Sequence, residues 1–341
     1  MQQPVLAIDA MGGDAGAELV VPASLAFLER HPRVSILLVG DPDRIAPFLS
    51  PLPSGQRSRV ELVAASEIVG MDEAPADALR RKKDSSMRVA INLVKQGRAH
   101  ACVSAGNTGA LMAISRFVLK TLPGIDRPAI ISAIPARHGH TQMLDLGANA
   151  DCSPSQLLQF AVMGTVIATE LHGVERPRVG LLNIGTEDNK GNEAIREAGK
   201  LLTASELNYV GFVEGNDIMS GRVDIVVTDG FTGNVALKTM EGLVRMLFQL
   251  IKDEAGKSWR QKLATLVAKP MLRSLQAKLD PRLYNGASLV GLQGIVIKSH
   301  GSADEVAFRN ALRTALIEIR KDAPGQIGEL MTRQQIPEDA H

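Results

Sequence analysis

The sequence contains few aromatic residues, few cysteines and almost no net charge. Aromatic side chains make up 3% of the 341 residues, which argues against the stacking platforms that bind single-stranded nucleic acid. A formal net charge of +1 argues against the broad basic footprint of a nucleic-acid-binding surface. The two cysteines, Cys102 and Cys152, predict no disulfide framework. We therefore expect a globular protein with no nucleic-acid partner.

Long apolar runs and a leader segment are also missing. The longest mostly apolar stretch, 157–169, is interrupted by Gln159 and Thr165, whereas about 20 apolar residues are needed to span a bilayer. The first residues do not combine a basic region with an apolar one, as a secretory signal would. We therefore expect a cytoplasmic protein.

Widespread catalytic and binding motifs are missing as well. The Gly-Lys-Ser tripeptide at 256–258 lacks the earlier glycine of a Walker A loop, because Ile251 stands in that place. No G-x-S-x-G elbow is present, and the loop 9–14 lacks the spacing of a dinucleotide fingerprint. His138 and His140 have no carboxylate or cysteine beside them, so they predict no metal site.

What is present is a repeated alternation of apolar strands and helices. Short segments rich in Val, Ile and Leu, mostly without period-two alternation, indicate strands covered on both faces. The expected strands are 5–8, 34–40, 60–64, 101–104, 129–134, 143–146, 179–184, 209–213, 224–228 and 294–298. The expected helices are 16–30, 86–97, 108–120, 155–171, 192–204 and 303–320, the fourth capped by Ser153-Pro154. This alternation predicts an α/β protein with a three-layer, doubly wound, mostly parallel sheet.

Several strands run directly into loops rich in Gly, Asn, Thr, Ser and Asp. The loops are 9–14, 104–109, 183–191, 228–234 and 298–304. Because loops at the carboxyl ends of parallel strands meet at one crevice, we expect a shared ligand site there. Glycine allows close backbone approach, and the helix that follows points free N–H groups at the ligand. Such a donor-rich surface favours an anion, phosphate first.

The predicted phosphate and substrate contacts lie within these loops. They are Asp9, Gly12, Gly13, Asp14, Ser104, Gly106, Asn107, Thr108, Asn183, Gly185, Thr186, Thr232 and Gly233. The Ser104 and Thr108 hydroxyls and the backbone N–H groups near 107–109 would cradle the anion. The ordinary alternative is that Asp14, Asn107 or Thr108 caps the following helix.

The predicted catalytic residues are Lys238, Asn234, Asp229 and His300. Lys238 follows Asn234 by four residues, which places both on one helix face. From there a lysine can reach back over the loop as a point charge for phosphate; the alternative is a solvated lysine. His300 can donate to an oxyanion or act as an acid or base; the alternative is a surface or packing histidine.

The segment 235–284 breaks the alternation and is expected to be helical, with interruptions at Pro270 and Pro281. It contains ten Lys and Arg residues against four Asp and Glu residues, beside apolar residues at helical spacing. Such a surface suits an anionic bilayer or an acidic carrier protein; the alternative is a dimer-interface helix with a solvated basic face. The tail 321–341 is expected to be loosely ordered.

Six motifs carry a family resemblance in a fixed order. They are Ala7-Ile-Asp-Ala-Met-Gly-Gly-Asp14, Ser104-Ala-Gly-Asn-Thr-Gly-Ala110, Leu144-Asp-Leu-Gly-Ala-Asn-Ala-Asp-Cys152, Leu182-Asn-Ile-Gly-Thr-Glu187, Val227-Thr-Asp-Gly-Phe-Thr-Gly-Asn234 and His300-Gly-Ser302. With these motifs the chain resembles the phosphate acyltransferase family, PlsX. The resemblance runs from Val5 to about Arg320. We therefore expect one domain over 1–320, which includes the helical segment 235–284.

The resemblance implies an enzyme that moves a fatty acyl group from acyl carrier protein to inorganic phosphate. The acyl phosphate then enters phospholipid synthesis. The resemblance also implies a homodimer that works at the inner face of the cell membrane, with no nucleotide cofactor and no metal. The implied fold is related to phosphotransacetylases and to isocitrate and isopropylmalate dehydrogenases.

The chemistry of this reaction matches the loops. Phosphate is already an anionic nucleophile near neutral pH and a thiolate leaves readily, so positioning and oxyanion stabilisation remain. One rival is a metal- and nicotinamide-dependent hydroxy-acid dehydrogenase of related fold. It needs carboxylate and arginine clusters, and Arg80 and Arg81 do not make a convincing one. Another rival is a non-catalytic acyl-carrier binding module.

Overall fold

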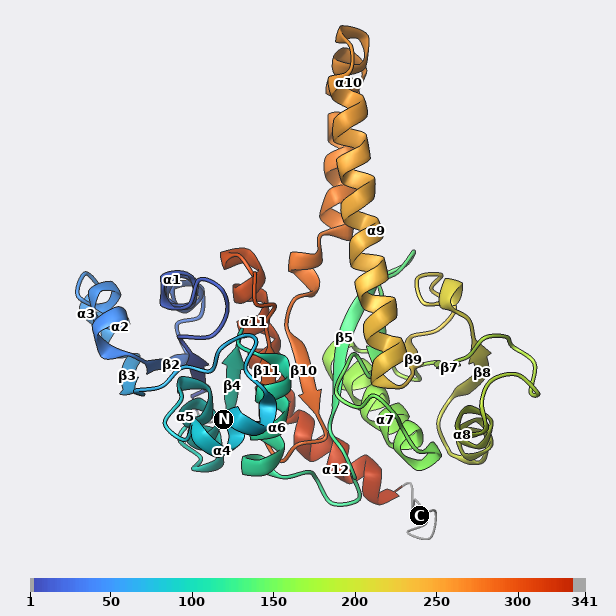
Figure 1. Cartoon of the computed structure of the whole chain (residues 1–341), viewed down its shortest axis with the longest axis horizontal. Coiled ribbons are helices and arrows are strands. Elements are labelled where there is room, and N and C mark those ends of the chain that lie inside the picture. Colours follow the sequence, from blue (N-terminus) through green and yellow to red (C-terminus); the bar gives the residue numbers. More distant parts are fainter. Residues whose placement is uncertain (1–2, 334–341) are drawn as a thin grey trace.

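The computed structural model describes residues 3–333, which form one mixed sheet flanked by helices (Figure 1). The sheet has 11 strands in the order β3-β2-β1-β4-β11-β10-β5-β6-β9-β7-β8. The strands are β1 (Val5–Asp9), β2 (Ser35–Gly40), β3 (Val60–Ala64), β4 (Ala101–Ser104), β5 (Ala129–Pro135), β6 (His140–Leu144), β7 (Val179–Leu182), β8 (Tyr209–Val213), β9 (Ile225–Val227), β10 (Ala287–Val290) and β11 (Ile295–Lys298). The predicted α/β class and mostly parallel sheet are confirmed.

Helices connect most of the strands and cover both faces of the sheet. The α-helices are α1 (Ala17–Arg30), α2 (Pro42–Leu49), α3 (Ser54–Arg57), α4 (Pro75–Arg81), α5 (Ser86–Lys95), α6 (Thr108–Leu119), α7 (Pro154–Val166), α8 (Glu193–Ala204), α9 (Gly230–Gly256), α10 (Trp259–Leu279), α11 (Glu305–Lys321) and α12 (Ala323–Arg333). Short helical turns are η1 (Ile167–Leu171), η2 (Gly215–Asp217) and η3 (Pro281–Tyr284). Ser153 caps α7 through a capping box with Gln156, and Pro154 is at its first turn, so that prediction is confirmed.

Alternate residues of the central strands enter different cores. Leu6 and Ile8 of β1 are fully buried in the core that includes side chains of α1 and α11. Ala7, between them, is buried on the other face with side chains of α5 and α6. Strands buried on both faces have apolar residues at successive positions. This burial explains why the strands lack a period of two.

The strands fall into two groups that run in opposite directions. β1, β2, β3, β4 and β11 are parallel to one another, and so are β6, β7, β8 and β9. Between the groups, β10 pairs antiparallel with β11 and β5, and β5 pairs antiparallel with β6. The carboxyl ends of the two groups therefore lie at opposite edges of the sheet. The expectation that all the Gly-rich loops meet at one crevice is wrong.

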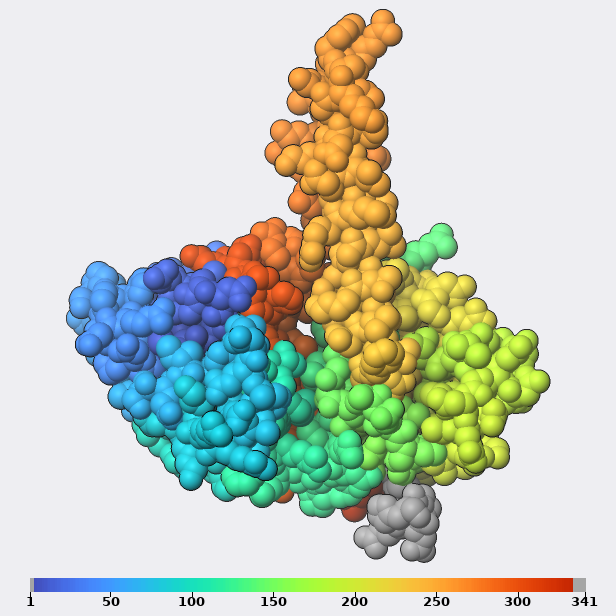
Figure 2. Space-filling model, in the orientation of Figure 1, coloured from blue at the N-terminus to red at the C-terminus, as the bar shows by residue number. Residues whose placement is uncertain are grey.

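Helices α9 and α10 form a long hairpin that projects from the body (Figures 1 and 2). As predicted, 235–284 is helical and contains no strand. The break expected at Pro270 is absent, because this residue lies inside α10. The chain turns instead at Lys257 and Ser258, and the Ser258 hydroxyl caps α10 by accepting from the Gln261 backbone N–H. A short helical turn does begin at Pro281.

The chain after Arg320 is more ordered than expected. Helix α11 ends at Lys321, its C-cap Asp322 has a left-handed conformation, and α12 follows at once. Ala323, Ile327 and Met331 of α12 are buried in the same core as side chains of α7. A loosely ordered tail is therefore wrong for 323–333, because three apolar residues at helical spacing have a place in the core. The residues 334–341 lie outside the described part.

Candidate functional site

The loops after β1, β4 and β11 meet at one edge of the sheet. The Asp14 backbone N–H donates to the Gly301 carbonyl at 2.9 Å, and the Ser299 N–H donates to the Ser104 carbonyl at 2.8 Å. A Cβ on Gly13 would lie 2.9 Å from the Gly301 oxygen. These contacts bring three of the predicted loops into one site, which we call the β1/β4/β11 cradle: 9–14, 104–109 and 298–304.

Asp9 is the buried centre of this cradle. Its carboxyl accepts from the hydroxyl of Ser86 at 2.6 Å and from that of Ser104 at 2.7 Å. Ser104 Oγ in turn accepts from the Gly106 N–H at 3.0 Å. Burial raises the pKa of Asp9, and these hydrogen bonds oppose the rise. Because Asp9 is buried and its carboxyl oxygens accept from Ser86 and Ser104, this residue ties the loops together.

The backbone of Gly12 lies closely packed between Asp9 and the loop after β4. A Cβ on it would lie 2.7 Å from Asp9 Oδ2 and 2.8 Å from the Gly106 nitrogen. Real Cβ atoms essentially never come so close. Glycine is therefore required by packing at this position. Asp14 is exposed and does not cap α1, whose N-cap is Gly16.

Asn107 and Thr108 have different places at the start of α6. Asn107 caps the helix, since its Oδ1 accepts from the Ala110 N–H at 3.0 Å. Its Nδ2 donates to the carbonyl oxygens of Met71 and Glu73, both at 2.9 Å. The Asn107 side chain is thus occupied by structure, as the capping alternative proposed. Thr108 is exposed at the first turn.

His300 follows β11, and one of its ring nitrogens is held by Ser302. Its Nδ1 accepts from the Ser302 backbone N–H at 3.2 Å, with the Ser302 hydroxyl 2.9 Å away. In the neutral ring, Nε2 must then carry the hydrogen. Burial lowers the pKa of His300, and the charge of Lys238 lowers it further. A neutral ring with an N–H donor suits stabilisation of a developing oxyanion.

Lys238 reaches the cradle from the other half of the protein. Helix α9 begins at the carboxyl end of β9, and Lys238 lies about 12 Å along it at 1.5 Å per residue. Its charge lowers the pKa values of both Lys298 and His300. Its Nζ donates to Glu241 Oε2 at 2.9 Å. Lys238 therefore connects the two groups of strands.

The other residues predicted after β9 lie at the opposite edge. Asp229 caps α9 by accepting from the N–H and the hydroxyl of Thr232, both at 2.8 Å. A Cβ on Gly233 would lie 1.9 Å from the Asp145 carbonyl oxygen, so Gly233 is required by close backbone packing. Asn234 is exposed and lies near Gly147. Gly233 and Asn234 thus pack at the loop after β6.

The loop after β7 mostly holds itself together. Asn183 Oδ1 accepts from the Ile184 N–H at 2.8 Å, and its Nδ2 donates to the Lys190 carbonyl at 3.3 Å. Gly185 is buried and Thr186 is exposed. This loop follows a strand of the β6–β9 group, so it lies at the edge opposite the cradle.

Three residues of these sites were not predicted. Ser86, at the start of α5, donates to Asp9. Asp145 is buried and accepts from the backbone N–H groups of Ile130, Ala148 and Asn149. Lys298 is a buried lysine at the end of β11. The signal for Lys298 was visible, because a charged residue ends the otherwise apolar run 295–298.

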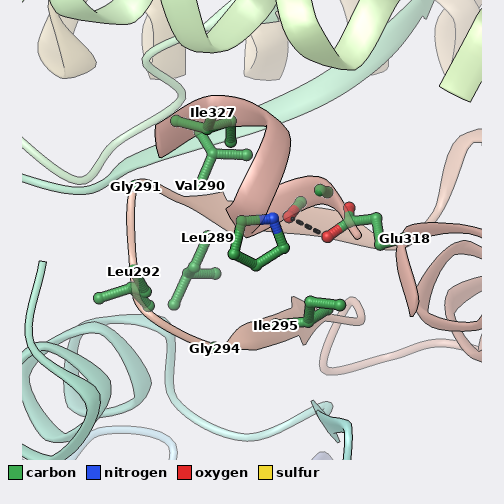
Figure 3. Close-up of a pocket in the computed structure, with 11 residues that line it drawn as sticks. Leu289, Val290, Gly291, Leu292, Gly294, Ile295, Glu318 and Ile327 are labelled. Carbon is green, nitrogen blue, oxygen red and sulfur yellow. Dashed lines mark hydrogen bonds between the residues drawn. The ribbon is translucent and has the colours of Figure 1, made fainter. Parts of the chain in front are cut away.

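Two hollows lie away from the cradle. The pocket in Figure 3 lies between β10, β11 and the last two helices, where Glu318 accepts from the Ser288 hydroxyl at 3.1 Å. A second, lined by His140, His172 and Asp224, holds the two histidine rings 4.3 Å apart. Within residues 3–333 no three His, Cys, Asp or Glu side chains are grouped as metal ligands.

Comparisons with known proteins agree on one family. The family model described as "Fatty acid synthesis protein" matches residues 5–324. A phosphate acyltransferase of Methylococcus capsulatus is 57% identical over 327 residues, which cover 96% of each chain. A phosphate acyltransferase of Alcanivorax borkumensis is 56% identical and covers 96% of this chain and 97% of its own.

Solved structures show the same fold at low identity. A phosphotransacetylase from Streptococcus pyogenes superposes with a TM-score of 0.62 at 18% identity, covering 93% of this chain and 94% of its own. A putative 4-hydroxythreonine-4-phosphate dehydrogenase from Salmonella typhimurium gives 0.53 at 11% identity, covering 93% and 99%. The predicted relation to the phosphotransacetylase fold is thus confirmed. The chain is more than 50% identical to these two phosphate acyltransferases over 96% of its length. It therefore belongs to the phosphate acyltransferase family.

Proposed function

We propose that this enzyme moves a fatty acyl group from the thioester of acyl carrier protein to inorganic phosphate. The products are the carrier thiol and an acyl phosphate for phospholipid synthesis. Membership of the phosphate acyltransferase family carries this assignment. It favours acyl transfer over the hydroxy-acid dehydrogenase and the non-catalytic carrier-binding module.

The β1/β4/β11 cradle supports the proposed chemistry. A phosphate oxygen attacks the thioester carbonyl carbon, the C–O bond forms, and the C–S bond then breaks as the carrier thiolate leaves and takes up a proton. The nucleophile and leaving group need no strong base or acid, so alignment, worth ~7–11 kcal/mol, is the main requirement. The first-turn N–H groups of α6, which begins at Thr108 directly after the loop 104–109, suit phosphate binding.

Stabilisation of the thioester oxygen is the second requirement. His300 offers a neutral N–H donor, and Lys238 offers a positive charge from α9. Removing one such donor typically costs about 3–4 kcal/mol in the transition state. We assign Lys238 and His300 to the thioester oxygen. We assign Thr108 and the loop backbones to phosphate.

The direct test is thiol release from an acyl carrier thioester at increasing phosphate concentration. The proposal requires a rate that depends on phosphate and saturates with it. Thiol release at the same rate without phosphate would indicate a thioesterase instead. Carrier binding without thiol release would indicate the non-catalytic module, and absorbance at 340 nm with NAD and a hydroxy acid would detect the dehydrogenase.

The α9–α10 hairpin offers a surface that could contact a second subunit or a membrane. Within residues 3–333 no helix is long and apolar enough to cross a membrane. Yet many large apolar side chains are exposed along the hairpin: Leu243, Met246, Leu247, Leu250, Trp259, Leu263, Leu266, Val267 and Met271. Basic side chains lie among them on α10, including Lys262, Lys269 and Arg273. We propose that the hairpin serves a homodimer contact and a transient contact with the anionic inner face of the membrane.

A further inference from the structure

Lys298 is a buried lysine with one donor to spare. It is the last residue of β11 and is 8% exposed. Its Nζ donates to the carbonyl oxygen of Ala105 at 3.3 Å and to that of Ser299. An ammonium group carries three N–H donors. Two are used by the loops of the cradle, so one remains for a ligand.

The charges around Lys298 leave it without a direct partner. Asp9 lies at the end of β1 and Asp14 in the loop that follows. The negative charges of both raise the pKa of Lys298, but neither carboxylate forms an ion pair with it. Lys238 on α9, which is itself paired with Glu241, has the opposite effect: its positive charge lowers the pKa of Lys298. His300, on the same loop, has a lowered pKa. Among residues 3–333 no carboxylate lies within ion-pair distance of Lys298 Nζ.

An unpaired buried cation is costly, because burial removes it from water. Here burial is the main cause that lowers the pKa of Lys298 to about 8. The amine therefore carries its proton at neutral pH and loses it only slightly above. An anion bound beside Nζ would supply the missing charge and raise the pKa again.

We infer that the ammonium group of Lys298 is the buried cation that binds the attacking phosphate. This inference rests on the proposed acyl transfer to phosphate and names one residue of that site. The Ala105 carbonyl oxygen that accepts from Nζ lies 3.6 Å and 3.7 Å from the positions that a Cβ on Gly13 and on Gly301 would take, so neither of these loop residues puts a side chain beside it. The charge of Lys238 is then left to act on the thioester oxygen.

As a consequence, kcat/KM for phosphate should depend on pH, whereas the KM for the acyl carrier thioester should not. Below about pH 8 the free enzyme has Lys298 charged and ready. Above it, phosphate must bind together with a proton, so kcat/KM for phosphate falls up to about tenfold per pH unit. The KM for the acyl carrier thioester does not follow. His300 has a lowered pKa and titrates below this range.

The experiment compares Lys298→Met and Lys298→Arg by phosphate-dependent thiol release from about pH 7 to about pH 9.5. Lys298→Met is expected to raise the KM for phosphate at least about tenfold at neutral pH and to abolish the fall at high pH. Lys298→Arg keeps a charge that does not titrate, so it should retain affinity within a few-fold and also show no fall. Lys200→Met, an exposed lysine paired with Glu197, is the matched control and should behave as wild type.

A second measurement is calorimetry of phosphate binding in two buffers of different ionisation enthalpy. At about pH 8 the wild-type enzyme should take up about half a proton more than Lys298→Arg, because half of the free amine is neutral there. Loss of stability in Lys298→Met with an unchanged KM and pH profile would reduce Lys298 to a support for the loops. If Lys298→Met does not fold, a wild-type pH profile in Lys298→Arg overturns the inference. A wild-type enzyme that needs no phosphate contradicts the proposed function, and calorimetry then still decides the role of Lys298.

Discussion

The backbone N–H of Asp14 donates to the carbonyl oxygen of Gly301, which joins the loop after β1 to the loop after β11. Between them Gly13 has a φ of +85°, and a Cβ there would lie 2.9 Å from that carbonyl oxygen and 3.0 Å from Ala105 Cβ. The cradle thus depends on a residue with no side chain, held in a conformation that suits glycine.

Gly13→Ala is expected to lower the free energy of unfolding by at least about 1–2 kcal/mol from the backbone conformation alone. The contacts with Gly301 and Ala105 add a further cost. Gly139→Ala is the matched control, since Gly139 has a φ of +74° and open space around its Cβ position. Urea unfolding measures both variants. An equal loss of unfolding free energy in both variants would show that the contacts with Gly301 and Ala105 add no cost. Wild-type activity in Gly13→Ala would indicate that phosphate binds at another place.

Lys238→Met is expected to lower the rate of thiol release at least about tenfold, equivalent to about 1.4 kcal/mol of transition-state stabilisation. The reason is the lost charge beside the thioester oxygen. Steady-state rates at saturating phosphate measure the effect. Lys252→Met, further along the same helix, is the control and should keep the wild-type rate. An unchanged rate in a folded Lys238→Met protein would leave Lys238 with no role beyond its pair with Glu241.

The raised pKa of Glu318 leads to a prediction of how the free energy of unfolding changes with pH. It is fully buried, and burial raises its pKa to about 8 although the Ser288 hydroxyl hydrogen bond opposes the rise. A folded pKa above the unfolded one means that the folded state binds more protons between about pH 4.5 and pH 8. Stability therefore falls as the pH rises through this window, by about 1.4 kcal/mol per pKa unit at most.

Glu318→Gln removes the titrating proton and should be more stable than wild type near pH 8, with little difference in acid. Thermal unfolding across the pH range measures this. Glu175→Gln, an exposed carboxyl, controls for the change of charge and should leave the wild-type profile intact. A Glu318→Gln protein that loses stability equally at every pH would contradict the raised pKa.

Sequence patterns identified most elements because the strands are buried on both faces, as Leu6, Ala7 and Ile8 illustrate. They did not identify β10, a four-residue strand directly after the helical segment. They also could not show that the β5–β6 hairpin reverses the sheet, because strand direction is set by long-range pairing rather than by local pattern. The loops after β7 and β9 were therefore placed with the cradle by mistake.

The site was predicted better by type than by position. Gly12, Gly13 and Ser104 lie together as expected, because glycine and small polar residues mark tight strand-to-helix turns. Asn107 and Asp229 proved to be helix caps, a role that uses the same residue types. Lys238 reaches the cradle only because α9 runs back across the sheet, which no local motif encodes.

Membrane contact through the hairpin predicts binding that depends on charge. The enzyme should sediment with vesicles containing anionic lipid, weakly with neutral vesicles, and less as salt rises. Replacing Lys262, Lys269 and Arg273 with Glu should release it, while thiol release from a small soluble thioester stays nearly unchanged. The matched control places Glu at Arg81, Lys83 and Lys95 on the body. Equal binding to both kinds of vesicle would remove the electrostatic part of the proposal.

The central claim is that phosphate itself accepts the acyl group. The most direct measurement supplies radiolabelled inorganic phosphate with acyl carrier thioester and compares label in the acyl product with thiol released. The account predicts one labelled phosphate in the product for each thiol, and no thiol release above background when phosphate is omitted. Thiol release that leaves the product unlabelled would contradict the account.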